Sequence, residues 1–209
     1  MFGMVRHEPP EVAEAIARFA AEHADRGVAA LGLAGDELLP SLPSFRRAFE
    51  IAREAGLLVV PHAGETGGPA SVRETLDLLK PDRIAHGVRA VEDLDLLRRL
   101  ADEGVTCDVC PTSNVRLGIV PELALHQVPA LLAAGVPLTL NADDQLYFGS
   151  KVGEEYEVAR RAFGLTDEQL AEIARTSARA SGAPAEAVAR MLAGIDAWLA
   201  TDPAAFTEP

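Results

Sequence analysis

The feature that most constrains the fold of this chain is a repeat of short apolar stretches, each followed by polar residues. Five such stretches end at Glu37, His62, His86, Cys110 and Asp143, about 24 to 33 residues apart, which is the length of one strand plus one crossover helix. The repeat predicts βα units in a parallel sheet with right-handed crossovers. Because the carboxyl ends of parallel strands lie on one side, we expect the polar residues to meet there.

Helices alone are expected after Asp144. Helical periodicity predicts one helix at 154–163 and one that is capped by Thr166. A last helix, at 184–199, should turn four apolar residues inward: Val188, Met191, Leu192 and Ile195. We therefore expect one α/β domain over 1–209, in which a partial barrel (1–150) is followed by helices (151–209).

Charge and cysteine content limit the partners and the compartment. The net charge of −13 would repel nucleic acid and anionic membranes, so neither is expected as a partner. Cys107 and Cys110 are too few for a disulfide framework, and residues three apart on a strand face opposite sides, so we expect no shared metal or disulfide. No transmembrane run or signal peptide is evident in the sequence, and a cytoplasmic location is expected.

Imidazole and carboxylate groups dominate the predicted strand ends. The strand ends together supply His62, Glu65, His86 and the adjacent pair Asp143 and Asp144. Imidazole and carboxylate groups in combination suit one Zn²⁺ or another divalent first-row metal, which would make hydroxide from bound water near neutral pH. Glu65, three residues after His62, is placed to transfer protons to a substrate. The ordinary alternative is that the Asp143-Asp144 pair caps the next helix and that His86 is a buried, hydrogen-bonded histidine.

Five strings resemble, in matching order and spacing, successive signatures of the adenosine deaminase family of metal-dependent amidohydrolases. They are LAGDE at 33–37, HAGE at 62–65, IAHG at 84–87, CPTSN at 110–114 and LNADD at 140–144. The resemblance implies a (β/α)8 barrel of the TIM type. It also implies a zinc-dependent reaction that replaces the 6-amino group of a purine by oxygen and releases ammonia.

The resemblance further implies a role for each matching residue of the reaction centre. His62 and Asp143 would be metal ligands, and Asp143 would also contact the attacking water. Glu65 would protonate purine N1 while hydroxide attacks C6. His86 would orient and stabilise that hydroxide.

For the substrate, the resemblance implies contacts from two further residues. The backbone N–H of Gly35 would contact the purine, Asp144 would accept a hydrogen bond near N7, and His126 would be structural. The substrate would be a small purine nucleoside such as adenosine, or a related compound such as adenine, aminodeoxyfutalosine or methylthio-adenosine. The matching residues would bind the purine and the metal, so they do not indicate which of these compounds is the substrate.

The sequence departs from the family pattern in ways that affect the metal site most. No His-x-His pair is present, although such a pair supplies two further ligands on the family's first strand. Met1–Arg6 resembles the end of the third strand, so we expect an incomplete barrel of about five carboxy-terminal βα units. Gln145 stands where the family usually has proline, and Thr176 where it commonly has asparagine.

Two alternatives to an active deaminase remain open, and the missing ligand pair supports the first. One is a catalytically incompetent fragment or pseudo-enzyme of this family, whose open barrel edges would favour self-association. The other is a metal-dependent amidohydrolase that acts on an ester or amide, a kind of enzyme that more often holds two metals bridged by a carboxylated lysine. The only lysines, Lys80 and Lys151, lie at no predicted strand end, which argues against the second alternative.

Overall fold

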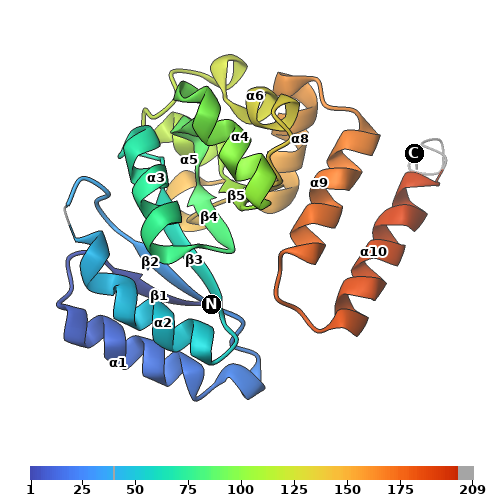
Figure 1. The fold of residues 1–209 in the computed structure, drawn as a ribbon. Coiled ribbons are helices and arrows are strands. Elements are labelled where there is room, and N and C mark those ends of the chain that lie inside the picture. The colour runs from blue at the N-terminus through green and yellow to red at the C-terminus, as the bar shows by residue number, and fades with distance from the viewer. Residues whose placement is uncertain (40, 202–209) are drawn as a thin grey trace.

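The computed structural model describes residues 1–39 and 41–201 and has an α/β architecture built on one parallel sheet (Figure 1). Six strands follow one another in the order of the chain. They are β1 (Phe2–Val5), β2 (Ala30–Ala34), β3 (Leu58–Ala63), β4 (Arg83–His86), β5 (Thr106–Val109) and β6 (Leu138–Leu140). The α/β class and the parallel sheet are confirmed, and the strand end expected at Met1–Arg6 is a full member of the sheet.

Helices fill the connections between the strands, as the repeat predicts. The α-helices are α1 (Pro10–Ala21), α2 (Arg46–Glu54), α3 (Gly68–Leu79), α4 (Leu94–Glu103), α5 (Pro111–Arg116), α6 (Val128–Ala133), α7 (Gln145–Phe148), α8 (Val152–Phe163), α9 (Asp167–Arg179) and α10 (Ala185–Leu199). Short 3-10 helices are η1 (Ala24–Arg26), η2 (Leu42–Phe45), η3 (Val88–Glu92) and η4 (Leu123–Leu125). Thr166 caps α9, as predicted, and it forms a capping box with Gln169.

Two apolar clusters hold the helices on the sheet. One joins β1 and β2 to α1 and α2, and Leu31 and Leu33 contribute to it from alternate positions of β2. The other joins β4, β5 and β6 to the helices that follow them. Val59 of β3 belongs to the first cluster and Ala63 to the second, so this strand lies where the two clusters meet.

A polar network across β4, β5 and β6 connects the sheet to the α9–α10 turn. Arg83 of β4 forms a salt bridge with Asp108 of β5 at 2.6 Å and donates to the carbonyl of Ala180 at 3.0 Å. Thr139 of β6 donates to Asp108 at 2.7 Å. These polar side chains are mutually satisfied, which is the condition for burying them at low cost.

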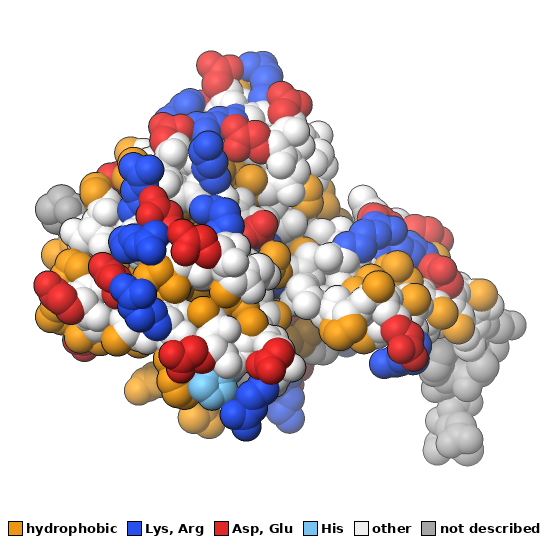
Figure 2. Space-filling model, turned by 60° about the horizontal axis from the view of Figure 1, so that its bottom comes forward, with side chains coloured by type: hydrophobic (Ala, Val, Ile, Leu, Met, Phe, Trp, Pro, Cys, Tyr) orange, Lys and Arg blue, Asp and Glu red, His pale blue; other side chains and the backbone are white. Residues whose placement is uncertain are grey.

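The last helix is covered less than the sequence predicts. Val188, Leu192 and Ile195 are half-buried, but Met191 is 39% exposed because α10 packs mainly against α9. An apolar groove of about 510 Å³ lies between these helices and α8, and none of the predicted site residues lines it. Figure 2 shows apolar side chains exposed among interspersed acidic and basic ones. Among the described residues, no helix has both the length and the apolar content to cross a bilayer.

Candidate active site

The carboxyl ends of β3 to β6 bring four of the predicted site residues together. The ring centroids of His62 and His86 are 5.0 Å apart. Glu65 Oε1 lies 3.5 Å from His86 Nδ1, and Asp143 Oδ2 lies 4.0 Å from His86 Nε2. His86 is therefore the centre of the group, with a carboxyl group beside each of its ring nitrogens.

Backbone conformation at two of these residues is strained. His86 has φ of 68° and Asp143 has φ of 53°, a region that costs a residue with a side chain about 1–3 kcal/mol. Gly87, which follows His86, could not carry a side chain, because a Cβ there would lie 2.6 Å from Cys107 Sγ. Strain of this kind clusters at functional sites, where the surrounding structure compensates for it.

Asn114 of α5 connects the site to a buried histidine. His126 Nδ1 accepts a hydrogen bond from the backbone N–H of Val128, so its Nε2 carries the proton and donates to Asn114 Oδ1 at 3.3 Å. The Asn114 amide nitrogen then lies 3.3 Å from Glu65 Oε1 and 3.4 Å from His86 Nδ1. His126 thus has a structural role, which is to orient Asn114. The sequence offered one signal for Asn114, its place in the CPTSN string.

Burial sets the protonation of the site. It raises the pKa of Glu65 to about 7, and the charges of Asp143 and Glu37 add to this effect. Burial also lowers the pKa of His86 well below its ordinary value, and the repulsion that a protonated His62 would exert lowers it further. The pKa of His62 is lowered for the same main reason. The site therefore combines a carboxylic acid that titrates near neutral pH with two neutral imidazoles.

The raised pKa of Glu65 predicts a pH-dependent stability. The folded chain binds the Glu65 proton more tightly than the unfolded chain, whose carboxyl has a pKa of 4.5, so the stability should fall as pH rises from 4.5 to 7. Glu65→Gln removes this cost. In metal-free chain, urea unfolding at a series of pH values should show the variant gaining about 3 kcal/mol on the wild type across that window. A difference that does not change with pH would contradict the raised pKa.

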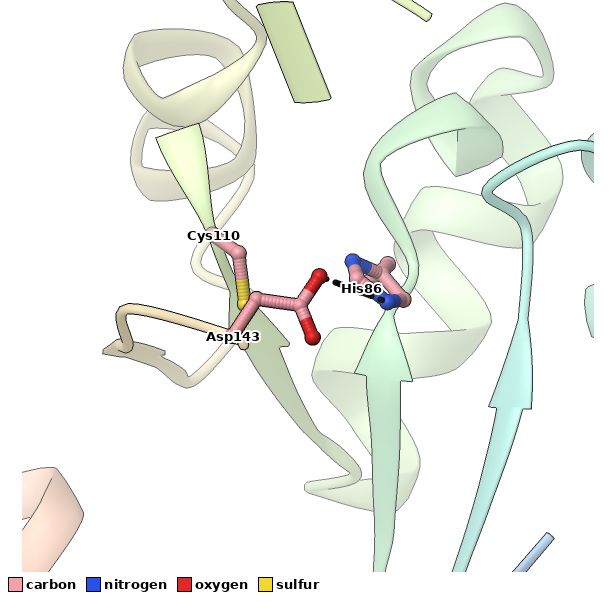
Figure 3. Close-up of side chains that lie close together, drawn as sticks. All are labelled: His86, Cys110 and Asp143. Atoms are coloured by element: carbon pink, nitrogen blue, oxygen red, sulfur yellow. Dashed lines mark ion pairs between the residues drawn. The ribbon is translucent and has the colours of Figure 1, made fainter. Parts of the chain in front are cut away.

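The donor groups suit a divalent metal. His62 Nδ1 is bonded to the carbonyl of Leu33 at 2.9 Å, so its Nε2 is the nitrogen left for a ligand role. Ser113 donates to Asp143 Oδ2 at 2.6 Å and orients that carboxylate. The ligand atoms of His86, Cys110 and Asp143 lie within 4.8 Å of one another (Figure 3). The imidazole and carboxylate donors fit Zn²⁺ or a related first-row ion.

Cys110 is the member of this group that the sequence did not suggest. Burial raises the pKa of its thiol well above the ordinary value, and the charge of Asp143 adds to this, so the thiolate that binds metals is disfavoured. Cys107 lies in the apolar core instead, and both cysteines are free.

Two predicted substrate-binding residues lie at the same side of the sheet, and Asp144 makes local contacts there. Asp144 is the N-cap of α7, and its Oδ1 accepts from the backbone N–H groups of Leu146 and Tyr147 at 3.0 and 3.4 Å. Gly35 follows β2 with φ of 102°, beside the end of β1. The ordinary roles considered for Asp144 and His86, helix cap and buried histidine, are therefore both present.

Comparison with known proteins identifies relatives of this arrangement. The profile of the adenosine deaminase family matches residues 1–198. A Streptomyces coelicolor protein whose name refers to adenosine/adenine deaminase is 52% identical over 194 residues, which cover 93% of this chain and 57% of that protein. The chain thus spans little more than half the length of this relative.

Solved structures agree with the sequence comparison. The crystal structure of adenine deaminase from Arthrobacter aurescens superposes with a TM-score of 0.86 at 35% identity, covering 95% of this chain and 61% of that one. An amidohydrolase from Burkholderia ambifaria, crystallised with bound Zn, gives a TM-score of 0.84 at 26% identity and covers 94% and 55% of the two chains. The six-stranded sheet therefore corresponds to part of a larger α/β barrel of the TIM type.

Proposed function

Because this chain belongs to the adenosine deaminase family, we propose that it hydrolyses the 6-amino group of adenine or adenosine. The observation that carries the proposal is the cluster of Glu65, His86 and Asp143 at the strand ends, with His62 beside it. The three side chains lie close enough together to contact one small substrate, which supports the proposal. The name of the Arthrobacter aurescens relative favours adenine, and that of the Streptomyces coelicolor relative includes adenosine.

The reaction needs a proton at purine N1 while a water oxygen bonds to C6. One proton of that water passes by way of Asp143 to the amino nitrogen, the bond from C6 to this nitrogen breaks and ammonia leaves. The proton of the new C6 hydroxyl returns to Glu65 as the C6 carbonyl forms. Glu65 gives the proton to N1, since its pKa of about 7 keeps part of the population protonated at neutral pH. Asn114 holds His86 Nδ1 as an acceptor, so the Nε2–H of His86 donates to the attacking oxygen. Asp143 accepts a hydrogen bond from the same water.

Zn²⁺ or another divalent first-row metal is the proposed cofactor, one per site. His62 Nε2 and the Asp143 carboxylate would hold it, and when bound it lowers the pKa of water enough to supply hydroxide near neutral pH. Asp144 uses Oδ1 for both of its cap bonds, which leaves Oδ2 for a bond near purine N7. The N–H of Gly35 is the proposed second contact to the purine.

Ammonia release from a panel of adenine compounds tests the proposal. The 209-residue chain, supplied with Zn²⁺, should deaminate adenine or adenosine, and the ranking of adenine, adenosine, aminodeoxyfutalosine and methylthio-adenosine would identify the substrate. A folded chain that releases no ammonia from any of them would contradict the proposal. It would support the alternative, a catalytically incompetent form that lacks the His-x-His ligands.

The open edges of the two outer strands lead us to predict that the chain self-associates. In the described part of the chain β1 and β6 are the two ends of the strand order, so each has one strand neighbour and an open edge. Phe19 of α1 and Met1 beside β1 add exposed apolar surface, 48% and 70% exposed. Light scattering should show the mean mass rising with concentration in the micromolar range. A constant 22.1 kDa species would contradict this prediction.

A further inference from the structure

The loop that carries Glu65 is built around a second carboxylate, that of Glu37. Glu37 follows β2, and its side chain crosses to the loop after β3. Its Oε2 accepts hydrogen bonds from the backbone N–H groups of Gly64 at 2.7 Å and Gly67 at 3.2 Å. Its Oε1 accepts from those of Glu65 at 2.9 Å and Thr66 at 3.1 Å. Four consecutive amides therefore converge on one side chain.

Consecutive N–H groups that point to one place form an anion-binding concavity, and hydrogen bonds to a charged acceptor are stronger than neutral ones. Here the anion is part of the chain itself. Gly67 lets the loop close around it, because a Cβ at this position would lie 2.8 Å from Glu37 Oε2 and 2.6 Å from Ser71 Cβ. Gly64, at the other end of the loop, has φ of 71°. The loop is thus shaped to the carboxylate of Glu37.

Glu65 is bonded at both of its ends. Its backbone N–H donates to Glu37, while its carboxyl lies 3.3 Å from the Asn114 amide and 3.5 Å from His86. We propose that Glu37 is a positioning residue, which fixes the 64–67 turn and so directs the Glu65 carboxyl towards the reacting purine. This inference rests on the proposed function, since its effect on catalysis passes through the proton donor of that reaction.

The charge of Glu37 has a second neighbour, which a test must take into account. Arg6 is buried, donates to the carbonyl of His62 at 2.9 Å, and has a positive charge that Glu37 helps to balance. Removing the charge of Glu37 could therefore disturb the site without any effect through the loop. A variant that keeps the charge but cannot span the loop separates the two effects.

Two substitutions of Glu37 separate the effect of its charge from the effect of its bonds to the loop, namely Glu37→Gln and Glu37→Asp. Glutamine keeps the length but places an NH₂ group against two N–H donors, and aspartate keeps the charge but withdraws it by one methylene. Asp82→Asn is the matched control, because the Asp82 carboxylate also accepts a backbone N–H of β3, that of Val59 at 2.8 Å, at the opposite end of the strand. All three are compared with the wild type in the full chain, after circular dichroism has shown that each is folded.

Hydrogen exchange and NMR are the readouts that do not depend on activity. The backbone amides of Glu65 and Thr66 should exchange at least about 10-fold faster in both Glu37 variants than in the wild type. In Asp82→Asn their exchange rates should equal those of the wild type. The side-chain NH₂ signals of Asn114 should shift in the Glu37 variants, because Glu65 moves away from them. Retained protection of the loop amides overturns the inference, and so does loss of protection with unchanged Asn114 signals.

Kinetics supply the link to catalysis. Glu37→Gln and Glu37→Asp should lower kcat by about 10- to 100-fold with little change in KM, as expected for a misplaced catalytic group. In the Glu65→Gln background Glu37→Gln should lower kcat no further. Normal kcat in Glu37→Asp would show that only the charge matters and would overturn the inference. A wild type without deaminase activity would contradict the proposed function, and the exchange and NMR results would still decide the role of Glu37.

Discussion

Replacing Glu65 by glutamine should lower kcat for the deamination of adenine or adenosine by about 10²- to 10⁴-fold, the usual effect of losing a general acid. Glutamine has nearly the same shape and can still accept the hydrogen bond from Asn114, but it has no acidic proton to give to purine N1. The wild-type kcat/KM should also decline above about pH 7, where the Glu65 carboxyl ionises. Steady-state ammonia release measures both effects.

The control for this experiment is metal and purine binding by the same variant. Glu65→Gln should bind both as well as the wild type does, so its defect should lie in kcat and not in KM. Glu186→Gln, which changes a glutamate paired with Arg190 on the exposed side of α10, should keep full activity. An active wild type whose turnover survives Glu65→Gln would show that another group protonates the purine.

The order of strands in this fold could be predicted because each strand of the sheet follows the same pattern. Val59 and Val60 are buried and His62 follows them, and Ile84 is buried before His86 in the same way. The period of one strand plus one helix then determines a parallel sheet. The burial of helix α10 was predicted less well. Its apolar stripe indicates that one face should be buried, but it does not show which other elements pack against that face.

The sequence also predicted that His62, Glu65, His86 and Asp143 would come close together, since each lies at the carboxyl end of a strand or in the loop that follows one. The contacts that hold these four side chains in place could not be predicted in the same way. Asn114 reaches the site because α5 begins immediately after β5, a turn that sequence periodicity cannot show. Glu37 acts through backbone amides, and no sequence pattern records which amides lack a partner. Contacts that depend on loop geometry therefore had to come from the structure.

Replacing Asp143 by asparagine should weaken Zn²⁺ binding by more than about 100-fold, because loss of an outer-sphere partner alone typically costs 10- to 100-fold and a direct ligand contributes more. The neutral amide loses both the charge and the second anionic oxygen that the proposed site offers beside His62. The hydrogen bond from Ser113 can be kept by the amide oxygen, so the fold should not change. Titration with Zn²⁺, followed by metal analysis of the desalted protein, measures the effect.

Asp144→Asn is the matched control, because it is the same substitution one residue further along the chain. Asparagine is as good an N-cap as aspartate, so α7 should remain capped through the bonds to Leu146 and Tyr147 and metal binding should not change. The Zn²⁺ affinity of Ser113→Ala should lie between those of the two variants, about 10- to 100-fold weaker than that of the wild type. This substitution removes only the hydrogen bond that orients Asp143. If Asp143→Asn bound as much zinc as Asp144→Asn and the wild type, Asp143 would not be a metal ligand. Cys110 and His86 would then be the next pair of residues to test as ligands.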